Sequence, residues 1–137
     1  MIEPILYILM RNDLDSLNCG KAAAQATHAA SDFEQNVLLL PENDTFSQCV
    51  LEGVSRWRGN RTFGTTIVLE ARWPMIENVI TFIDNNDINV FCRIIHDPTY
   101  PIRDGEVTHL IPLNTCAWIF GDKEVLQPYL YDLELMK

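Results

Sequence analysis

The sequence lacks long apolar runs. Uninterrupted apolar runs such as residues 5–10 and 37–40 are far shorter than the roughly 18 to 20 residues that a membrane-spanning helix needs. The first residues also lack a basic segment followed by a long apolar one, which is the pattern of a secretory signal. We therefore expect a protein that makes no contact with a membrane and resides in the cytoplasm.

Positive charge is also scarce. The 137 residues include 10 lysines and arginines against 19 aspartates and glutamates, which gives a formal net charge of −9. This balance argues against nucleic-acid binding by bulk electrostatics, so an RNA partner would have to meet a local basic patch. One candidate patch consists of Arg56, Arg58 and Arg61, with Trp57 among them and Phe63 after them. It is either a clamp for phosphates with an aromatic ring that stacks on a base, or an ordinary solvated loop.

Motifs for metal binding and covalent catalysis are missing as well. The four cysteines are widely spaced, without a C-x-x-C pair or a nearby pair of histidines, so reduced thiols explain them better than a zinc site does. No G-x-S-x-G elbow or other nucleophile signature is present, so covalent catalysis has no support. We expect no metal and no other cofactor.

Strands alternate with helices along the chain. Apolar or β-branched runs predict strands at residues 5–10, 64–71, 88–95 and 115–121, with 107–112 as an edge strand or hairpin arm. Helical spacing, capping residues and prolines predict helices at residues 21–35, 45–57, 74–85 and 123–133, the last shortened or kinked by Pro128. This order predicts one layered α/β domain in which parallel crossovers connect the first three strands, while the direction of the last strand stays open.

A polar stripe runs along the first predicted helix. Lys21, Gln25, His28 and Asp32 occur at i, i+4, i+7 and i+11 and so share one face, which is either a binding site or a solvated surface. Ligands of open α/β sheets gather at the carboxyl ends of strands. That rule places the stripe and Asp97, which follows the third predicted strand, at the same edge of the sheet.

Each of these residues also has a purely structural explanation. Asp97 precedes Pro98 and suits a turn, within a loop that two prolines and Gly105 make rigid. His28 is the group most easily tuned for proton transfer near neutral pH, but it can equally bond a neighbouring backbone group. Lys21 can face solvent, although a cation is mildly unfavourable in the first turn of a helix.

Two segments carry a resemblance to a known family: Met-Arg-Asn-Asp-Leu at residues 10–14 and Gly-Lys-Ala-Ala-Ala-Gln-Ala-Thr-His-Ala at residues 20–29. They resemble the opening signature of the archaeal and eukaryotic type of peptidyl-tRNA hydrolase. The Asp-Pro-Thr-Tyr-Pro of residues 97–101 is similar to a loop of the bacteriophage-encoded members, which would place the protein in a host cytoplasm. The likeness is thin between residues 37 and 61.

The resemblance implies a fold, a reaction and a set of residues. The fold is a single three-layer α/β domain with a four-stranded, mostly parallel mixed sheet and helices on both faces. The reaction is hydrolysis of the ester that joins a peptide to the 3′-terminal ribose of tRNA. Carried over by position, the catalytic residues are Lys21, His28, Asp97, Thr108 and Thr115. The predicted substrate contacts are Arg11, Gln25, Arg56, Arg58, Arg61, Thr99 and Tyr100.

Two departures from the family pattern bear on activity. Cys19 stands where the family has the first lysine of Lys-Gly-Lys, so Lys21 would have to supply the missing charge. The loop of residues 97–108 is also longer than the family's Asp-Ala-Gly-Arg-Thr segment, so its arginine and threonine are not matched one for one.

We therefore expect a peptidyl-tRNA hydrolase that is a monomer or a homodimer. Asp97 would activate water, Lys21 would offset negative charge, and Thr108 or Thr115 would bond the ester or the ribose. One alternative is an inactive family member that binds a tRNA end, a nucleotide or a protein. Another is a small hydrolase or transferase that acts on a different nucleotide-linked ester or amide.

Overall fold

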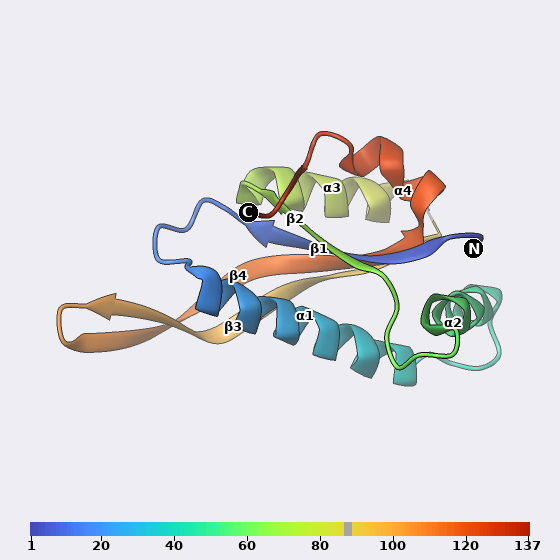
Figure 1. The fold of residues 1–137 in the computed structure, drawn as a ribbon, viewed down its shortest axis with the longest axis horizontal. Helices are drawn as coiled ribbons and strands as arrows, with labels where there is room; N and C mark the ends of the chain where they lie inside the picture. The colour runs from blue at the N-terminus through green and yellow to red at the C-terminus, as the bar shows by residue number, and fades with distance from the viewer. Residues whose placement is uncertain (87–88) are drawn as a thin grey trace.

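The computed structural model describes residues 1–86 and 89–137, which form an open mixed sheet with helices on both faces (Figure 1). Within these residues the strands are β1 (Pro4–Arg11), β2 (Thr66–Ala71), β3 (Phe91–Asp104), β4 (Val107–Asp122) and β5 (Glu134–Leu135). The helices of the same residues are α1 (Cys19–Leu38), α2 (Thr45–Arg58), α3 (Trp73–Asn85) and α4 (Lys123–Leu130). No helix in this part of the chain combines the length and the apolar character that crossing a membrane requires.

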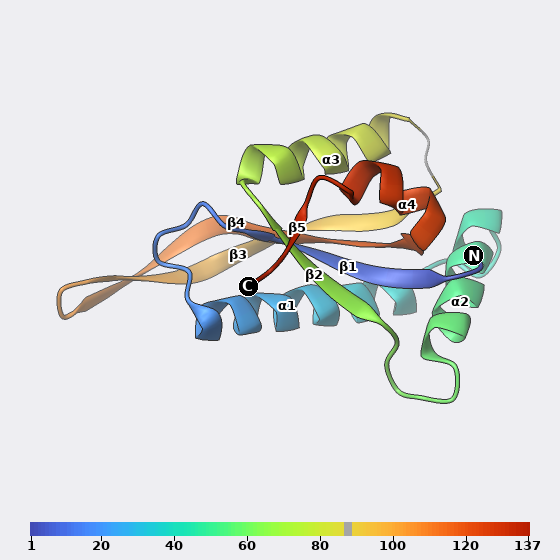
Figure 2. The same ribbon diagram turned by 45° about the horizontal axis from the view of Figure 1, so that its top comes forward.

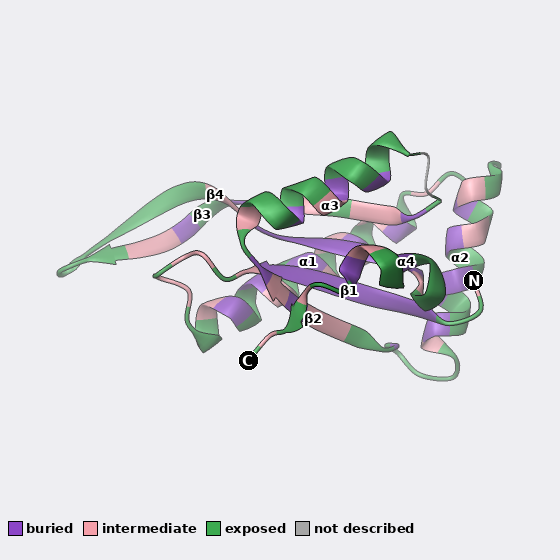
Figure 3. Ribbon diagram, turned by 90° about the horizontal axis from the view of Figure 1, so that it is seen from above, coloured by how far each residue is buried: buried purple, intermediate pink, exposed green. Residues whose placement is uncertain are grey.

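Strand β1 lies inside the sheet, whose strand order is β3-β4-β1-β2-β5. Its odd-numbered residues from Ile5 to Leu9 pack with α3 and α4, and its even-numbered residues from Leu6 to Met10 pack with α1 and α2. The helices therefore form one layer on each side of the sheet (Figures 2 and 3). Because β1 is covered on both faces, its sequence is apolar throughout rather than alternating.

The predicted sheet was wrong in the number and direction of its strands. The described residues contribute five strands instead of four, because the short β5 pairs with β2. Only the β1–β2 pair is parallel within the described sheet, whereas β1–β4, β2–β5 and β3–β4 are antiparallel. The difference arises because β4 returns directly from β3 in a hairpin and enters the sheet between β3 and β1, so β3 points the same way as β1 without touching it.

The rigid loop predicted after the third strand is instead one side of a long hairpin, called the arm where it extends beyond the sheet (residues 98–113; Figure 1). Pairing of β3 with β4 continues to Asp104 and Val107, with register shifts between Ile95 and His96 and between Asp97 and Tyr100. The prolines of β3 are accommodated because β3 is an edge strand and is irregular there. Gly105, with φ of 60°, makes the turn at the tip.

The predicted helix positions hold with shifted ends. The side chain of Asn18 accepts the N–H of Lys21 at 2.9 Å, so α1 begins at Cys19, two residues before the predicted start. Helix α4 ends at Leu130 rather than near residue 133, in agreement with the shortening expected from Pro128. Helix α3 ends at Asn85, as predicted, and the predicted strand start at residue 88 lies outside the described residues.

Candidate functional site

Three buried polar side chains connect α1 with β3 and β4, level with the carboxyl end of β1. The Gln25 Nε2 donates to Asp97 Oδ2 at 2.7 Å, and the Thr115 Oγ1 donates to Gln25 Oε1 at 2.6 Å. The exposed fractions of Gln25, Asp97 and Thr115 are 2%, 8% and 1%. Polar groups this deeply buried need hydrogen-bond partners, and these residues supply them to one another.

The backbone just after Asp97 completes the surroundings of its carboxylate. The backbone N–H and the hydroxyl of Thr99 donate to Asp97 Oδ1 at 2.8 Å and 3.2 Å. Burial raises the pKa of Asp97, but the hydrogen bonds from Gln25 and Thr99 and the nearby His28 outweigh it, so the pKa lies below the ordinary value. Asp97 is therefore an ionised acceptor at neutral pH, better suited to orient water than to remove its proton.

Lys21 holds the base of the arm from the first turn of α1. Its Nζ donates to the Pro101 carbonyl oxygen at 2.7 Å and lies 5.3 Å from the centroid of the Tyr100 ring. The Tyr100 hydroxyl in turn lies 3.1 Å from Ser16 Oγ, in the segment that precedes α1. Because an ammonium group carries three donors, Lys21 keeps donors beyond the one that Pro101 accepts.

Arg11 ties the end of β1 to β4. Its Nε pairs with Asp13 Oδ1 at 2.8 Å, and its Nη1 donates to the Asn114 carbonyl oxygen at 3.0 Å. The Asn114 Oδ1 lies 2.8 Å from His96 Nδ1, and His96 precedes Asp97 in the chain. Arg11 therefore connects the carboxyl end of β1 with the backbone of β4 opposite His96, the neighbour of Asp97.

The remaining residues of the stripe have different surroundings. His28 is exposed and close enough to Asp97 to lower its pKa. Asp32 accepts the indole N–H of Trp118 at 2.8 Å and lies 3.6 Å from Arg93 Nε. Trp118 is fully buried, and its indole nitrogen is the only polar atom of its side chain. Accepting the hydrogen bond of that nitrogen is a structural role that explains Asp32.

Thr108 does not join these residues. It lies on the arm opposite Arg103, close to the turn at the tip of the hairpin, and it is exposed. Of the two threonines carried over from the family, the structure brings Thr115 to Asp97 through Gln25 and leaves Thr108 away from it. Thr99, expected to contact substrate, contacts Asp97 instead.

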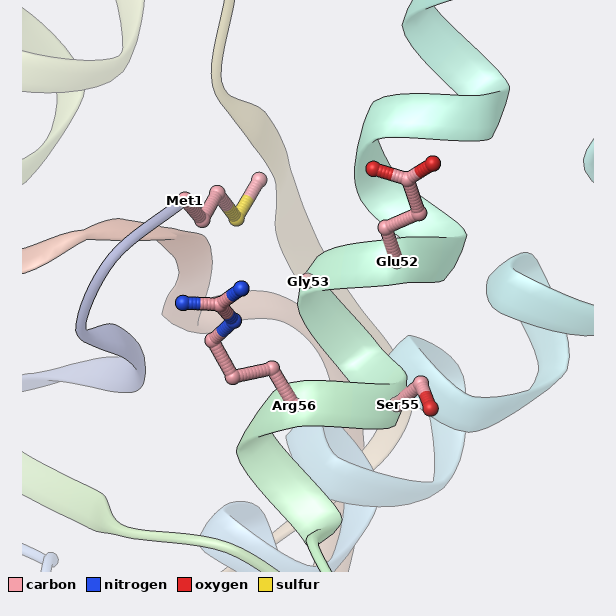
Figure 4. Close-up of a pocket in the computed structure, with 5 residues that line it drawn as sticks. All are labelled: Met1, Glu52, Gly53, Ser55 and Arg56. Atoms are coloured by element: carbon pink, nitrogen blue, oxygen red, sulfur yellow. The ribbon is translucent and has the colours of Figure 1, made fainter.

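The three arginines of the basic patch lie toward the other end of α1. Arg58 pairs with Glu34, which is nine residues beyond Gln25 and hence about 14 Å farther along the helix axis. Arg56 lines a separate hollow of about 450 Å³ together with Met1 and Glu52 (Figure 4). The structure therefore does not bring these arginines to the residues around Asp97.

Trp57 and Phe63 differ in their availability for stacking. Trp57 is 7% exposed and its indole N–H donates to the Thr65 carbonyl oxygen at 2.6 Å, so it cannot stack on a base. Phe63 is 65% exposed. Of the two aromatic residues, only the second keeps the surface that base stacking needs.

Sequence reasoning missed Asn114, Asp13 and the Pro101 carbonyl group, which complete the site. Arg11 and Asn114 are 103 positions apart, so no local pattern marks their contact. The bond from the Thr99 backbone to Asp97 had a local signal, because aspartate commonly accepts the N–H two residues ahead in a turn. Within the described residues, no group of three or more histidine, cysteine, aspartate or glutamate residues is placed to hold a metal ion.

Comparisons with known proteins identify the fold alone. No protein-family model matches the sequence, and no curated protein matches it. A solved structure of a protein of unknown function from Agrobacterium tumefaciens strain C58 is similar, with a TM-score of 0.50 over 100% of both chains at 7% sequence identity. A likeness at this identity concerns the arrangement of the helices and strands.

Proposed function

We propose that the chain hydrolyses the ester between the peptide and the 3′-terminal ribose of peptidyl-tRNA. The observation that carries the proposal is the hydrogen bond from Gln25 to Asp97, at 2.7 Å. It joins two segments that separately resemble the peptidyl-tRNA hydrolases, the Ala-rich helix and the loop that begins at Asp97. It also lies level with the carboxyl end of β1, and the carboxyl ends of strands are where α/β sheets commonly bind ligands.

The reaction needs a water molecule, a proton acceptor and a group that stabilises negative charge. In the proposed step, the water oxygen bonds to the ester carbonyl carbon while Asp97 orients that water. His28 takes the water proton and passes it to the departing ribose oxygen, so that a free peptide and an intact tRNA leave. Lys21 stabilises the oxyanion with the donors that Pro101 does not use.

The two threonines near Asp97 have positioning roles in this proposal. The Thr115 hydroxyl donates to Gln25 and thereby turns the amide so that Nε2 faces Asp97. The Thr99 hydroxyl and backbone N–H fix the other carboxylate oxygen. Neither residue bonds the ester or the ribose, and Thr108 takes no part.

The second candidate is a protein of the same fold that binds a tRNA end without cleaving it. It is favoured by Cys19, which is exposed in the first turn of α1 where the family has a lysine. Without that lysine, Lys21 is the one ammonium group of α1, and part of its donor capacity goes to Pro101.

Release of N-acetylated amino acid from N-acetyl-aminoacyl-tRNA separates the two candidates. The wild type should deacylate this substrate above the blank, Asp97→Ala should not, and Asp104→Ala at the tip of the arm should match the wild type. If the wild type and Asp97→Ala both stay at the blank rate while tRNA binding is retained, the chain is a binding protein and the hydrolase proposal fails.

A further inference from the structure

A second hollow is lined in part by Arg11, the residue that also donates to the Asn114 carbonyl oxygen. It measures about 270 Å³, and its lining comes from the connection between β1 and α1, the end of β2 and the C-terminal segment: Arg11, Asn12, Leu14, Leu17, Asn18, Cys19, Glu70, Met136 and Lys137. Figure 1 shows the corresponding segments together: the connection from β1 to α1, the end of β2 and the C-terminal segment. The hollow therefore occupies the carboxyl end of the parallel pair β1–β2, next to the point where β1 meets the antiparallel β4.

A chain of neighbouring residues connects the hollow with Asp97. Arg11 lines the hollow and donates to Asn114, whose side chain contacts His96, the neighbour of Asp97. Along α1, Cys19 of the hollow and Gln25 of the site are six residues apart, which is about 9 Å of helix rise. A single nucleoside can bridge this separation.

The lining suits a flat ring that carries hydrogen-bonding groups. Leu14, Leu17 and Met136 give it apolar walls, and a methionine sulfur packs favourably against an aromatic ring. The Glu70 carboxylate, half-buried, offers acceptors only. The Asn18 Oδ1 already accepts the Lys21 N–H, so its amide nitrogen is the part of that side chain left to donate to a ring nitrogen.

We propose that this hollow binds a purine base through its exocyclic amino group, which Glu70 accepts, and that in peptidyl-tRNA this base is the terminal adenine. The assignment of the base as the terminal adenine of peptidyl-tRNA rests on the proposed function. The binding of a purine base rests only on the residues that line the hollow. Its volume is close to the lower end of the roughly 300 to 1,000 Å³ of small-molecule sites, as expected for a base rather than a whole nucleotide. Seating the base there directs its ribose toward Asp97.

The test compares adenosine 5′-monophosphate with inosine 5′-monophosphate, each titrated into the full chain and followed by NMR chemical shifts. The two nucleotides share the phosphate and ribose. Inosine has a carbonyl oxygen at C6 where adenosine has the amino group, and it carries a proton on N1. We expect the adenosine nucleotide to bind about tenfold more tightly, the ratio that corresponds to one lost hydrogen bond to a charged group. Equal affinity, or binding of neither nucleotide at millimolar concentration, overturns the proposal.

Three variants test whether the preference for the adenosine nucleotide arises from binding in this hollow. Glu70→Gln should reduce the preference for the adenosine nucleotide to about twofold or less, since an amide can also donate to the inosine carbonyl oxygen. Glu52→Gln makes the same change of charge in the hollow of Figure 4 and should leave the preference intact. Leu14→Trp should weaken the binding of both nucleotides, because the larger side chain fills the hollow. If Glu52→Gln removes the preference as well, or Leu14→Trp leaves binding unchanged, the nucleotides bind elsewhere.

The outcome is independent of catalysis. Nucleotide binding without any deacylation by the wild type supports this hollow as a base site and removes the hydrolase proposal. Deacylation that depends on Asp97, together with nucleotide binding that ignores Glu70 and Leu14, supports the hydrolase proposal and overturns this one.

Discussion

The side-chain amide of Gln25 on α1 donates to the carboxylate of Asp97 on β3, 72 positions away, at 2.7 Å. Both residues are buried, and the same amide accepts the hydroxyl of Thr115 at 2.6 Å. A glutamine that bonds a carboxylate on one side and a hydroxyl on the other has a single satisfactory orientation, because only its nitrogen can donate to the carboxylate. The position of Asp97 thus depends on a residue that need not touch substrate.

Replacing Gln25 by leucine should lower the free energy of unfolding. Gln25→Leu keeps the side-chain size but leaves the buried Asp97 and Thr115 without their shared partner, so we expect a loss of about 1 to 3 kcal/mol in the free energy of unfolding. Urea denaturation measures it. Gln48→Leu, on the exposed face of α2, is the matched control and should change the free energy by no more than about 0.5 kcal/mol. Equal effects of the two variants would contradict the network.

The lowered pKa of Asp97 predicts how stability depends on pH. Because the pKa is lower in the folded chain than in the unfolded one, the ionised carboxylate stabilises the fold above about pH 4, the ordinary aspartate range. This contribution disappears as the pH falls through the folded pKa. The free energy of unfolding of the wild type should therefore fall more steeply below pH 4 than that of Asp97→Asn. Parallel curves would show that Asp97 has an ordinary pKa.

The cysteines should differ in reactivity. Burial raises the pKa of Cys116 to about 12, and burial together with Asp84 raises that of Cys92 to about 12. Cys19 is exposed in the first turn of α1. With an aromatic disulfide reagent at mildly alkaline pH, Cys19→Ser should remove one equivalent from the fast phase of the folded protein, whereas Cys116→Ser should leave that phase unchanged. Fast labelling of Cys116 in the folded chain is the contrary result.

Local sequence signals were sufficient to predict several elements of the fold. The apolar run of β1 predicted a strand, and the capping residues that start α1 and α2, Asn18 and Asp44, lie within a few positions of the helices they cap. These features depend on side chains within a few positions of one another. They are therefore visible without knowledge of the tertiary structure.

Other features depend on contacts between distant segments. The direction of β4 follows from its pairing with β1 and β3, and β5 is too short to leave an apolar pattern. The predicted proximity of α1 and Asp97 is confirmed, although β3 continues past Asp97 to Asp104. The register that leaves Thr108 on the arm is set by the irregular pairing after Ile95. Spacing in the sequence does not encode such a register.

The central claim is that Asp97 orients the water that cleaves peptidyl-tRNA. Its most direct test is the single-turnover rate of N-acetyl-aminoacyl-tRNA deacylation by Asp97→Asn, which keeps the size of the side chain and removes the charge. With an unchanged far-UV circular dichroism spectrum at neutral pH as a check of folding, we predict a rate at least about 100-fold below that of the wild type. A rate within about twofold of the wild type would contradict the account.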